Sequence, residues 1–189
     1  MPRLRILLAA SLALTAGCTG FRELRPGVFR APQMHEDLLA RKVGEHDIKT
    51  LVCLRGGRSC RSTARVAIGM ETTFVSVPLS ASRLPEPGKL LALWQIAATA
   101  ERPLLLHCRA GVDRTGLASA IVTLHDTGDL AAAFDQLDLI PYGHVSIGPT
   151  AAMDTVLELY APHATAGMAF PDWARNVYPG QRAELLGGS

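Results

Sequence analysis

The chain has 189 residues, of which 48% are hydrophobic, and this is enough for a single globular domain with its own core. Its formal net charge is +2 at pH 7, and beyond residue 17 it carries 17 basic and 17 acidic side chains. Only 5% of the residues are aromatic, so the chain lacks both the general positive field and the stacking surface that nucleic-acid binding requires. We therefore expect no nucleic-acid partner.

Residues 1–17 have the pattern of a secretory signal peptide. Arg3 and Arg5 supply positive charge, and the apolar run at 6–16 is too short to span a bilayer as a stable helix. This pattern predicts that the domain works outside the cytoplasm.

The signal peptide ends on small residues followed by a cysteine, and segment 14–18 reads LTAGC. The segment resembles the lipobox of bacterial lipoproteins, which implies lipidation of Cys18 and a membrane-anchored protein facing the periplasm. Simple cleavage nearby is the alternative, and it implies a periplasmic or secreted protein. After the signal peptide we predict a short tether at 18–25 and a folded domain at 26–162.

Strands alternate with helices along the rest of the chain. From apolar runs and helical spacing we predict strands at 28–30, 48–54, 73–77 and 103–107, and helices at 34–43, 63–70, 90–100, 117–125, 130–137 and 151–160. The alternation predicts a single α/β domain with a mainly parallel central sheet flanked by helices. We expect 163–189 to be a surface wrap or tail, with Phe170, Trp173 and Tyr178 as anchors. Ligands of such sheets bind beyond the C-terminal strand ends, where several loops meet.

The segment 107–116 reads HCRAGVDRTG and joins a buried strand to an apolar helix. Its small residues let backbone amides converge, and a tight loop that opens into a helix N-terminus binds anions. The same field favours the thiolate form of Cys108. We expect the substrate to be held by four successive loop residues, Arg109, Ala110, Gly111 and Val112.

The side chains that flank this loop have separate predicted roles. Arg114 supplies a planar guanidinium that matches two oxygens of a phosphoryl group. Thr115 is placed to donate to the Cys108 thiolate. His107 is expected to order the loop through backbone hydrogen bonds rather than to transfer protons.

This segment resembles the signature of the protein tyrosine phosphatase superfamily, which is His-Cys, five residues, Arg, Thr or Ser, and Gly. Its DRTG ending is similar to that of dual-specificity and atypical bacterial members, and a fainter similarity covers about residues 26–160. The resemblance implies the cysteine-phosphatase fold and a reaction with no metal or other cofactor. In that reaction Cys108 forms a cysteinyl-phosphate, which water then hydrolyses.

The general acid is where the sequence departs from the superfamily pattern. The acid is usually an Asp on the loop after the strand that ends here near Val77, but residues 78–86 contain no Asp. Three alternatives remain, namely Asp113, Glu86 or no dedicated acid. Asp113 also has a structural interpretation, in which it braces the loop by accepting backbone N–H bonds.

A second loop, on the same predicted face, is rich in arginine. Arg55, Arg58, Arg61 and Arg65 form either a patch that recognises an acidic substrate or a solvated loop paired with nearby acids. Arg55 directly follows the predicted strand and is the best candidate for substrate contact.

Three cysteines remain once Cys18 is set aside, so in an oxidising compartment at least one thiol is free or pairs with another chain. As in some relatives, a reversible disulfide between Cys108 and either Cys53 or Cys60 would protect the nucleophile.

These features predict an exported phosphatase that acts on phosphorylated proteins with tyrosine or dual specificity. Its rivals are an inositol polyphosphate or other small polyphosphate phosphatase, and a catalytically weak phosphate-binding module. Sulfur transfer ranks last, because rhodanese-type loops lack the Arg-Thr-Gly ending.

Overall fold

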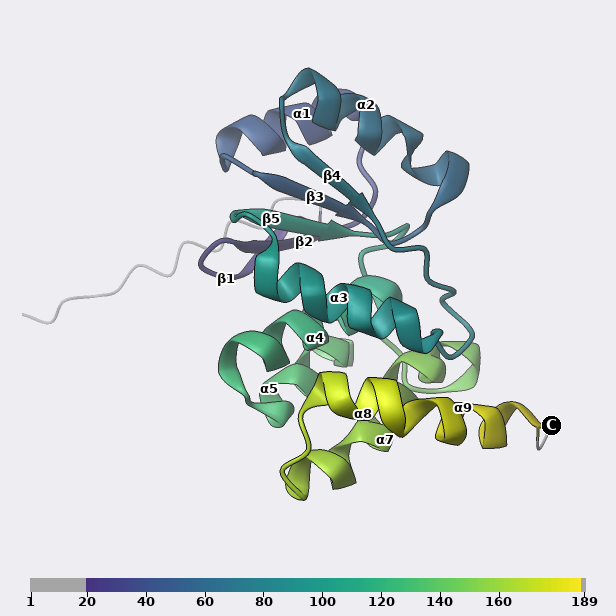
Figure 1. The fold of residues 1–189 in the computed structure, drawn as a ribbon. Coiled ribbons are helices and arrows are strands. Elements are labelled where there is room, and N and C mark those ends of the chain that lie inside the picture. The colour runs from purple at the N-terminus through teal and green to yellow at the C-terminus, as the bar shows by residue number, and fades with distance from the viewer. Residues whose placement is uncertain (1–19, 188–189) are drawn as a thin grey trace, which may run out of the picture.

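The computed structural model describes residues 20–187, and Figure 1 shows them as one sheet with helices on both faces. The predicted signal peptide at 1–17 and Cys18 lie outside the described residues. No helix within 20–187 is long and apolar enough to cross a membrane.

Five short strands form the sheet in the order β1-β2-β5-β3-β4. They are β1 (Arg22–Arg25), β2 (Val28–Ala31), β3 (Thr50–Cys53), β4 (Thr73–Ser76) and β5 (Leu104–His107). Strands β2, β5, β3 and β4 run parallel, whereas β1 is antiparallel to β2. Every residue of β2, β3 and β5 is buried, as parallel strands covered on both faces require. The predicted α/β fold with a mainly parallel sheet is confirmed.

Helices connect and cover the strands. Those of the described chain are α1 (Glu36–Glu45), α2 (Arg61–Gly69), α3 (Pro87–Thr99), α4 (Asp113–Thr127), α5 (Leu130–Phe134), α6 (Leu139–Tyr142), α7 (Ala152–Thr165), α8 (Phe170–Asn176) and α9 (Tyr178–Gly187), with 3₁₀ turns η1 (Gly57–Cys60), η2 (Asp135–Leu137) and η3 (Gly148–Ala151). Figure 1 shows α1 and α2 on one face of the sheet and α3, α4 and the later helices on the other.

Each face of the sheet has its own hydrophobic core, and β5 contributes to both. Leu105 belongs to the core under α1 and α2, whereas Leu104 and Leu106 belong to the core under α3 and α4. Alternate side chains of a strand point to opposite faces, so one apolar run supplies both layers. Helix α4 is buried along most of its length because α3, α5 and α7 pack around it.

The predicted tether at 18–25 contains a strand, so the boundary predicted at residue 26 is wrong. Arg22 of β1 pairs with Arg30 of β2, and Gly27, at φ +75°, permits the tight turn between them. The segment around β1 is strongly charged, which is typical of an edge strand.

The segment 163–189, predicted as a surface wrap or tail, forms the end of α7 and helices α8 and α9 as far as the structure describes it. Its three large aromatic side chains are at most 1% exposed, namely Phe170, Trp173 and Tyr178. Phe170 stacks on Trp94 of α3 with 5.3 Å between the ring centroids. Because these rings are buried among the other helices, the segment is part of the core, and the folded unit does not end at residue 162.

Candidate active site

The two loops that the sequence places on one face meet at one edge of the sheet. Cys53 at the end of β3 lies in register with His107 at the end of β5. Residues 108–112 connect β5 to α4, which begins at Asp113, four residues before the predicted start. The acidic and basic residues that follow the loop therefore stand in the first turn of a helix.

Cys108 lies at the base of this loop and is 2% exposed. It is the free cysteine of residues 20–187. The backbone N–H of Gly111 points at its Sγ, 3.3 Å away. The loop is therefore arranged around the sulfur of Cys108.

Gly111 has a position that no other residue fits. Its φ is +74°, and a Cβ there would lie 2.6 Å from the carbonyl carbon of Ala31 and from the nitrogen of Pro32. The loop therefore rests directly on the backbone that follows β2, and only glycine permits both this conformation and this approach.

Arg30 was not singled out in the sequence, yet it fixes the outer side of the loop. This buried side chain of β2 donates to the carbonyls of Gly111 at 2.9 Å and Val112 at 3.1 Å, and to that of Gln136 at 3.1 Å. Its guanidinium carbon also lies 3.9 Å from the centre of the Tyr142 ring. In a trans peptide the next N–H points opposite to the carbonyl, so carbonyls held by Arg30 turn the following amides into the loop.

Arg30 stays charged in this position. Burial lowers its pKa to about 10, against the opposing influence of Tyr142 and Cys108, and this value is still well above neutral pH. A fixed positive charge thus stands behind the anion-binding loop. The signal in the sequence was one arginine inside the otherwise apolar strand 28–31.

His107 supports the end of β5. Its Nε2 lies 3.1 Å from Oγ1 of Thr63 on α2, and both side chains are buried. Burial lowers the pKa of His107 to about 4, so the ring is neutral at physiological pH. His107 thus contacts a side chain of a neighbouring helix, and a backbone hydrogen bond with Cys108 opposes the lowering of its pKa.

Arg114 and Thr115 follow the loop in α4. Arg114 makes no ion pair with any described carboxylate, and its Nε is buried without a partner among residues 20–187. The Thr115 hydroxyl is also buried without a described partner, so the predicted donation to Cys108 is not formed in this structure. No group of three or more His, Cys, Asp or Glu side chains in the described chain is arranged to hold a metal ion.

Asp113 contacts a histidine that sequence reasoning missed. Its Oδ1 lies 2.9 Å from Nδ1 of His144, and Nε2 of that ring lies 2.7 Å from Oδ2 of Asp154 on α7. Asp154 also accepts from the Ser146 hydroxyl at 2.8 Å. The hydrogen bond the structure records for Asp113 is thus to a side chain, not to the backbone amides expected of a loop brace.

Glu86, the alternative acid, faces another part of the surface. It lines a cavity of about 550 Å³ together with Arg83, Lys89 and Arg182, and no residue of 107–116 lines this cavity. Helix α9 holds the segment 78–86 in place, because the Tyr178 hydroxyl donates to the carbonyl of Pro85 at 2.8 Å. The structure therefore brings Asp113, and not Glu86, to the loop.

Arg55 is linked to the loop through Gln33. Its Nη1 donates to Oε1 of Gln33 at 2.6 Å, and the Gln33 backbone N–H donates to the carbonyl of Arg109 at 3.1 Å. Gln33 also donates to the carbonyl of Ser59 at 2.8 Å. Arg55, the predicted substrate contact, thus lies beside the loop, where Gln33 holds its side chain.

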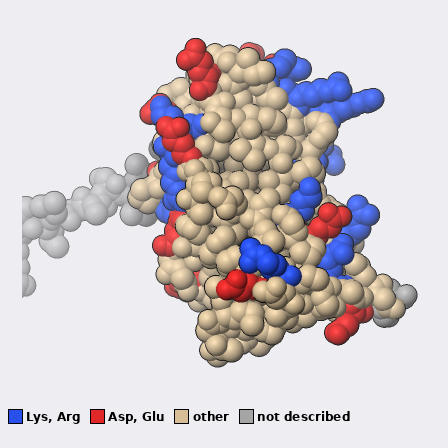
Figure 2. All heavy atoms as spheres, in the orientation of Figure 1, with Lys and Arg blue, Asp and Glu red and all other residues tan. Residues whose placement is uncertain are grey.

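The other arginines of the second loop divide into two groups. Arg65 forms an ion pair with Glu36 of α1, which fits the solvated-loop interpretation. Arg58 and Arg61 are exposed and make no ion pair with a described carboxylate. Figure 2 shows basic side chains on the right-hand side of the molecule, over η1 and the start of α2, near the edge where the strands end.

The expected disulfide to Cys108 is wrong, because Cys53 and Cys60 pair with each other at a Cα–Cα distance of 6.0 Å. Turn η1 leads the chain back so that Cys60 faces the end of β3. The bond closes the arginine-bearing loop and leaves Cys108 as the free thiol of residues 20–187.

Comparison with known proteins agrees with this geometry. Residues 89–125 match the model of the tyrosine phosphatase family, and no curated protein matches the chain. Among solved structures, TpbA of P. aeruginosa is 21% identical, with a TM-score of 0.62 over 84% of this chain and 89% of its own.

A second match is the core catalytic domain of the PP-IP phosphatase SIW14 from S. cerevisiae. It is 16% identical, with a TM-score of 0.62 over 75% of this chain and 85% of its own. These likenesses show the fold, and the family match spans the whole of 107–116. The chain thus shares the fold of these phosphatases and contains a segment that is similar to the tyrosine phosphatase family.

Proposed function

We propose that this chain is an exported phosphatase that hydrolyses phosphate monoesters through a cysteinyl-phosphate on Cys108. One observation carries the proposal: the Gly111 amide is aimed at Cys108 Sγ at the N-terminus of α4, next to Arg114, whose guanidinium has no partner among residues 20–187. A nucleophile, a loop amide at a helix N-terminus and a fork of N–H donors are groups that an in-line attack on a phosphoryl group uses.

The reaction has two balanced steps. The Cys108 thiolate attacks phosphorus and forms the S–P bond while the P–O bond to the leaving group breaks, and Asp113 gives its proton to the leaving oxygen. Water then attacks phosphorus, Asp113 takes a proton from that water, and the S–P bond breaks to release inorganic phosphate and the thiolate. Arg114 binds the non-bridging oxygens throughout.

Phosphorylated proteins are the first proposed substrate class. TpbA of P. aeruginosa, which shares the fold, has been solved in complex with pTyr at 22% identity and a TM-score of 0.53 over 90% of this chain and 93% of its own. The exposure of Arg109 and Ala110 at the rim of the loop supports this class, because a side chain on a peptide can reach an open loop.

Small polyphosphates are the second candidate, favoured by the exposed Arg58 and Arg61 on the neighbouring loop. A fold relative of this chain, SIW14, is a PP-IP phosphatase. A ligand with several phosphates would engage these arginines as well as the Cys108 loop.

Export is proposed on two grounds. The sequence of 1–17 is that of a signal peptide, and the Cys53–Cys60 disulfide suits an oxidising compartment. Lipidation of Cys18 follows from its lipobox-like context. To test the anchor, the unchanged chain and Cys18→Ala are compared in cell fractions. We expect Cys18→Ala to be released from the membrane, and its retention in the membrane fraction argues against the anchor.

The experiment that tests the function compares the protein with Cys108→Ser on 4-nitrophenyl phosphate, phosphotyrosine and phosphoserine peptides, and inositol hexakisphosphate. We expect Cys108→Ser to lose roughly 10³-fold or more in turnover on every substrate that the protein hydrolyses. Equal activity in the variant rejects Cys108 as the nucleophile. Binding of phosphate without turnover of any substrate under reducing conditions supports the phosphate-binding module instead.

Substitution of Arg58 and Arg61 by Ser separates the two substrate classes. A loss confined to inositol hexakisphosphate favours the polyphosphate, whereas a loss confined to the peptides favours the phosphoprotein. Arg65→Ser is the matched control, because Arg65 is already paired with Glu36.

A further inference from the structure

His144 is held between two carboxylates, and nothing in the reaction above uses it. Its side chain is fully buried, with Asp113 Oδ1 2.9 Å from Nδ1 and Asp154 Oδ2 2.7 Å from Nε2. Buried ionisable groups are costly unless each finds a partner, and here both ring nitrogens do. Each ring nitrogen thus lies within hydrogen-bond distance of one carboxylate oxygen.

The surrounding chain holds this histidine in one orientation. His144 follows Gly143, whose φ of +78° ends α6, and its backbone N–H donates to the carbonyl of Asp138 at 3.3 Å. Asp154 stands in the first turn of α7 and is itself held by the Ser146 hydroxyl. Asp154 therefore holds the ring at Nε2, and Nδ1 on the other side of the ring faces the Asp113 carboxylate.

Asp113 is fixed by this contact at one oxygen only. Oδ1 accepts from His144, and Oδ2 has no described hydrogen-bond partner. The carboxyl is one residue from Arg114 and about one quarter exposed, in contrast to the buried ring behind it. One oxygen is thus held by the protein, and the other is available to a group bound in the loop.

We propose that His144 and Asp154 are positioning residues that hold Asp113 as the proton donor and acceptor of the phosphatase reaction. The inference rests on the proposed function and deepens it. In the first step the proton leaves Oδ2 of Asp113 for the leaving oxygen, and in the second step water returns a proton to Oδ2. In both states Oδ1 stays against Nδ1 of His144, and Asp154 holds the opposite nitrogen of the ring.

This arrangement takes the place of the missing acid in 78–86. A carboxyl inside the loop needs a support that sets its direction, because it stands at the start of a helix and is partly exposed to water. The His144 ring supplies that support, because it holds Oδ1 of Asp113 and leaves Oδ2 without a partner among residues 20–187.

The test compares leaving groups. Asp113→Asn, His144→Gln and the double variant are assayed on phenyl phosphate, whose leaving group needs a proton, and on 4-nitrophenyl phosphate, whose leaving group does not. We expect Asp113→Asn to lose about 10²-fold or more in kcat on phenyl phosphate, with a much smaller loss on 4-nitrophenyl phosphate and little change in KM. His144→Gln should show the same selective loss, and the double variant should lose no more than Asp113→Asn alone.

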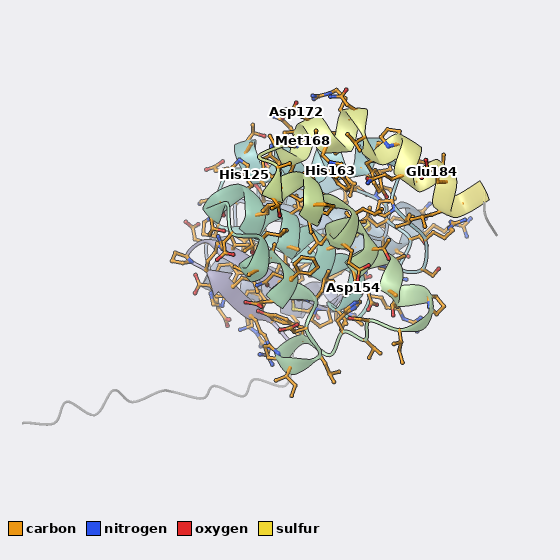
Figure 3. All side chains as sticks on the ribbon, turned by 90° about the horizontal axis from the view of Figure 1, so that it is seen from below. His125, Asp154, His163, Met168, Asp172 and Glu184 are labelled. Carbon is orange, nitrogen blue, oxygen red and sulfur yellow. A yellow bond between two sulfur atoms is a disulfide. The ribbon has the colours of Figure 1, made fainter. Side chains whose placement is uncertain are left out.

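His163→Gln is the matched control, because it removes a histidine from the same helix that carries Asp154. His163 contacts Gln181 and stands near the other end of α7, away from Asp154 (Figure 3). It should keep the kcat of the unchanged protein on both substrates.

Several outcomes overturn the inference. Losses in His144→Gln that are equal on both substrates, or that multiply with those of Asp113→Asn, show that the histidine only supports the fold. If His144→Gln does not unfold cooperatively, Asp154→Asn carries the same test, with an expected selective loss of about tenfold. Full activity of Asp113→Asn on phenyl phosphate rejects Asp113 as the general acid, and with it the positioning role of His144 and Asp154. The proposed phosphatase function is tested separately by Cys108→Ser.

Discussion

Arg30 is the residue on which the shape of the catalytic loop most depends. It holds three carbonyls through one planar fork and is buried against the Tyr142 ring. A charged side chain in this position stabilises the fold only while all its partners are present, because an unsatisfied buried group costs free energy.

Arg30→Lys should therefore lower the free energy of unfolding by about 2–4 kcal/mol, since an ammonium does not reach three carbonyls from one fork. The turnover of 4-nitrophenyl phosphate should fall at least about tenfold, because the loop amides lose their alignment. Urea denaturation and steady-state kinetics measure the two effects. Arg22→Lys, on the exposed partner position of β1, should change stability by no more than about 0.5 kcal/mol. Equal effects of the two substitutions would contradict this role.

Gly111 and Gly128 offer a matched pair at the residue scale. Both have positive φ, +74° and +69°, but a Cβ on Gly128 meets nothing within 4 Å, whereas a Cβ on Gly111 would meet backbone atoms at 2.6 Å. Gly128→Ala should cost about 1–2 kcal/mol, from the left-handed conformation alone. Gly111→Ala should cost more and abolish turnover, because the loop cannot stay on the end of β2. Comparable stability and turnover in the two variants would show that the close approach is unimportant.

At the scale of elements, the Cys53–Cys60 bond ties the end of β3 to η1. It closes a short loop, and chain-entropy reasoning for about eight residues gives a stabilisation of about 2.5 kcal/mol. Reduction of the protein should lower the free energy of unfolding by that amount, measured by urea denaturation with and without reductant. The Cys53→Ala/Cys60→Ala variant should not respond to reductant. A response of that variant would mean that the reductant acts elsewhere.

Much of the architecture was predictable because it depends on local patterns. The apolar run around 103–107 is buried on both faces and therefore reads as a central parallel strand. The loop after it combines a cysteine, small residues and an arginine within ten positions, so its chemistry is readable without a structure.

What could not be predicted depends on contacts between distant segments. His144 meets Asp113 across 31 positions and Asp154 across 10, and no spacing rule connects them. Strand β1 was missed because its charges suit an edge strand and a linker equally. The disulfide was misassigned because only the fold of η1 shows which two thiols face each other.

At the scale of the whole molecule, His107 makes stability depend on pH. Its pKa is about 4 in the folded protein and about 6.5 when exposed, so the unfolded chain binds the proton more readily. The resulting stability is fully present above pH 6.5 and is lost as the pH falls towards 4, by about 3 kcal/mol. Denaturation series between pH 7 and pH 4 should show this loss in the unchanged protein and a smaller one in His107→Gln. Parallel pH profiles for the two proteins would show that another group is responsible.

The burial of Phe170, Trp173 and Tyr178 has a consequence for biosynthesis. Phe170 stacks on Trp94 of α3, and the Tyr178 hydroxyl donates to the carbonyl of Pro85, far upstream in the chain. A nascent chain that already contains the complete loop 107–116 thus still lacks the segment that packs on Trp94. A chain terminated before residue 170 therefore carries the nucleophile on a domain whose apolar surface is still exposed.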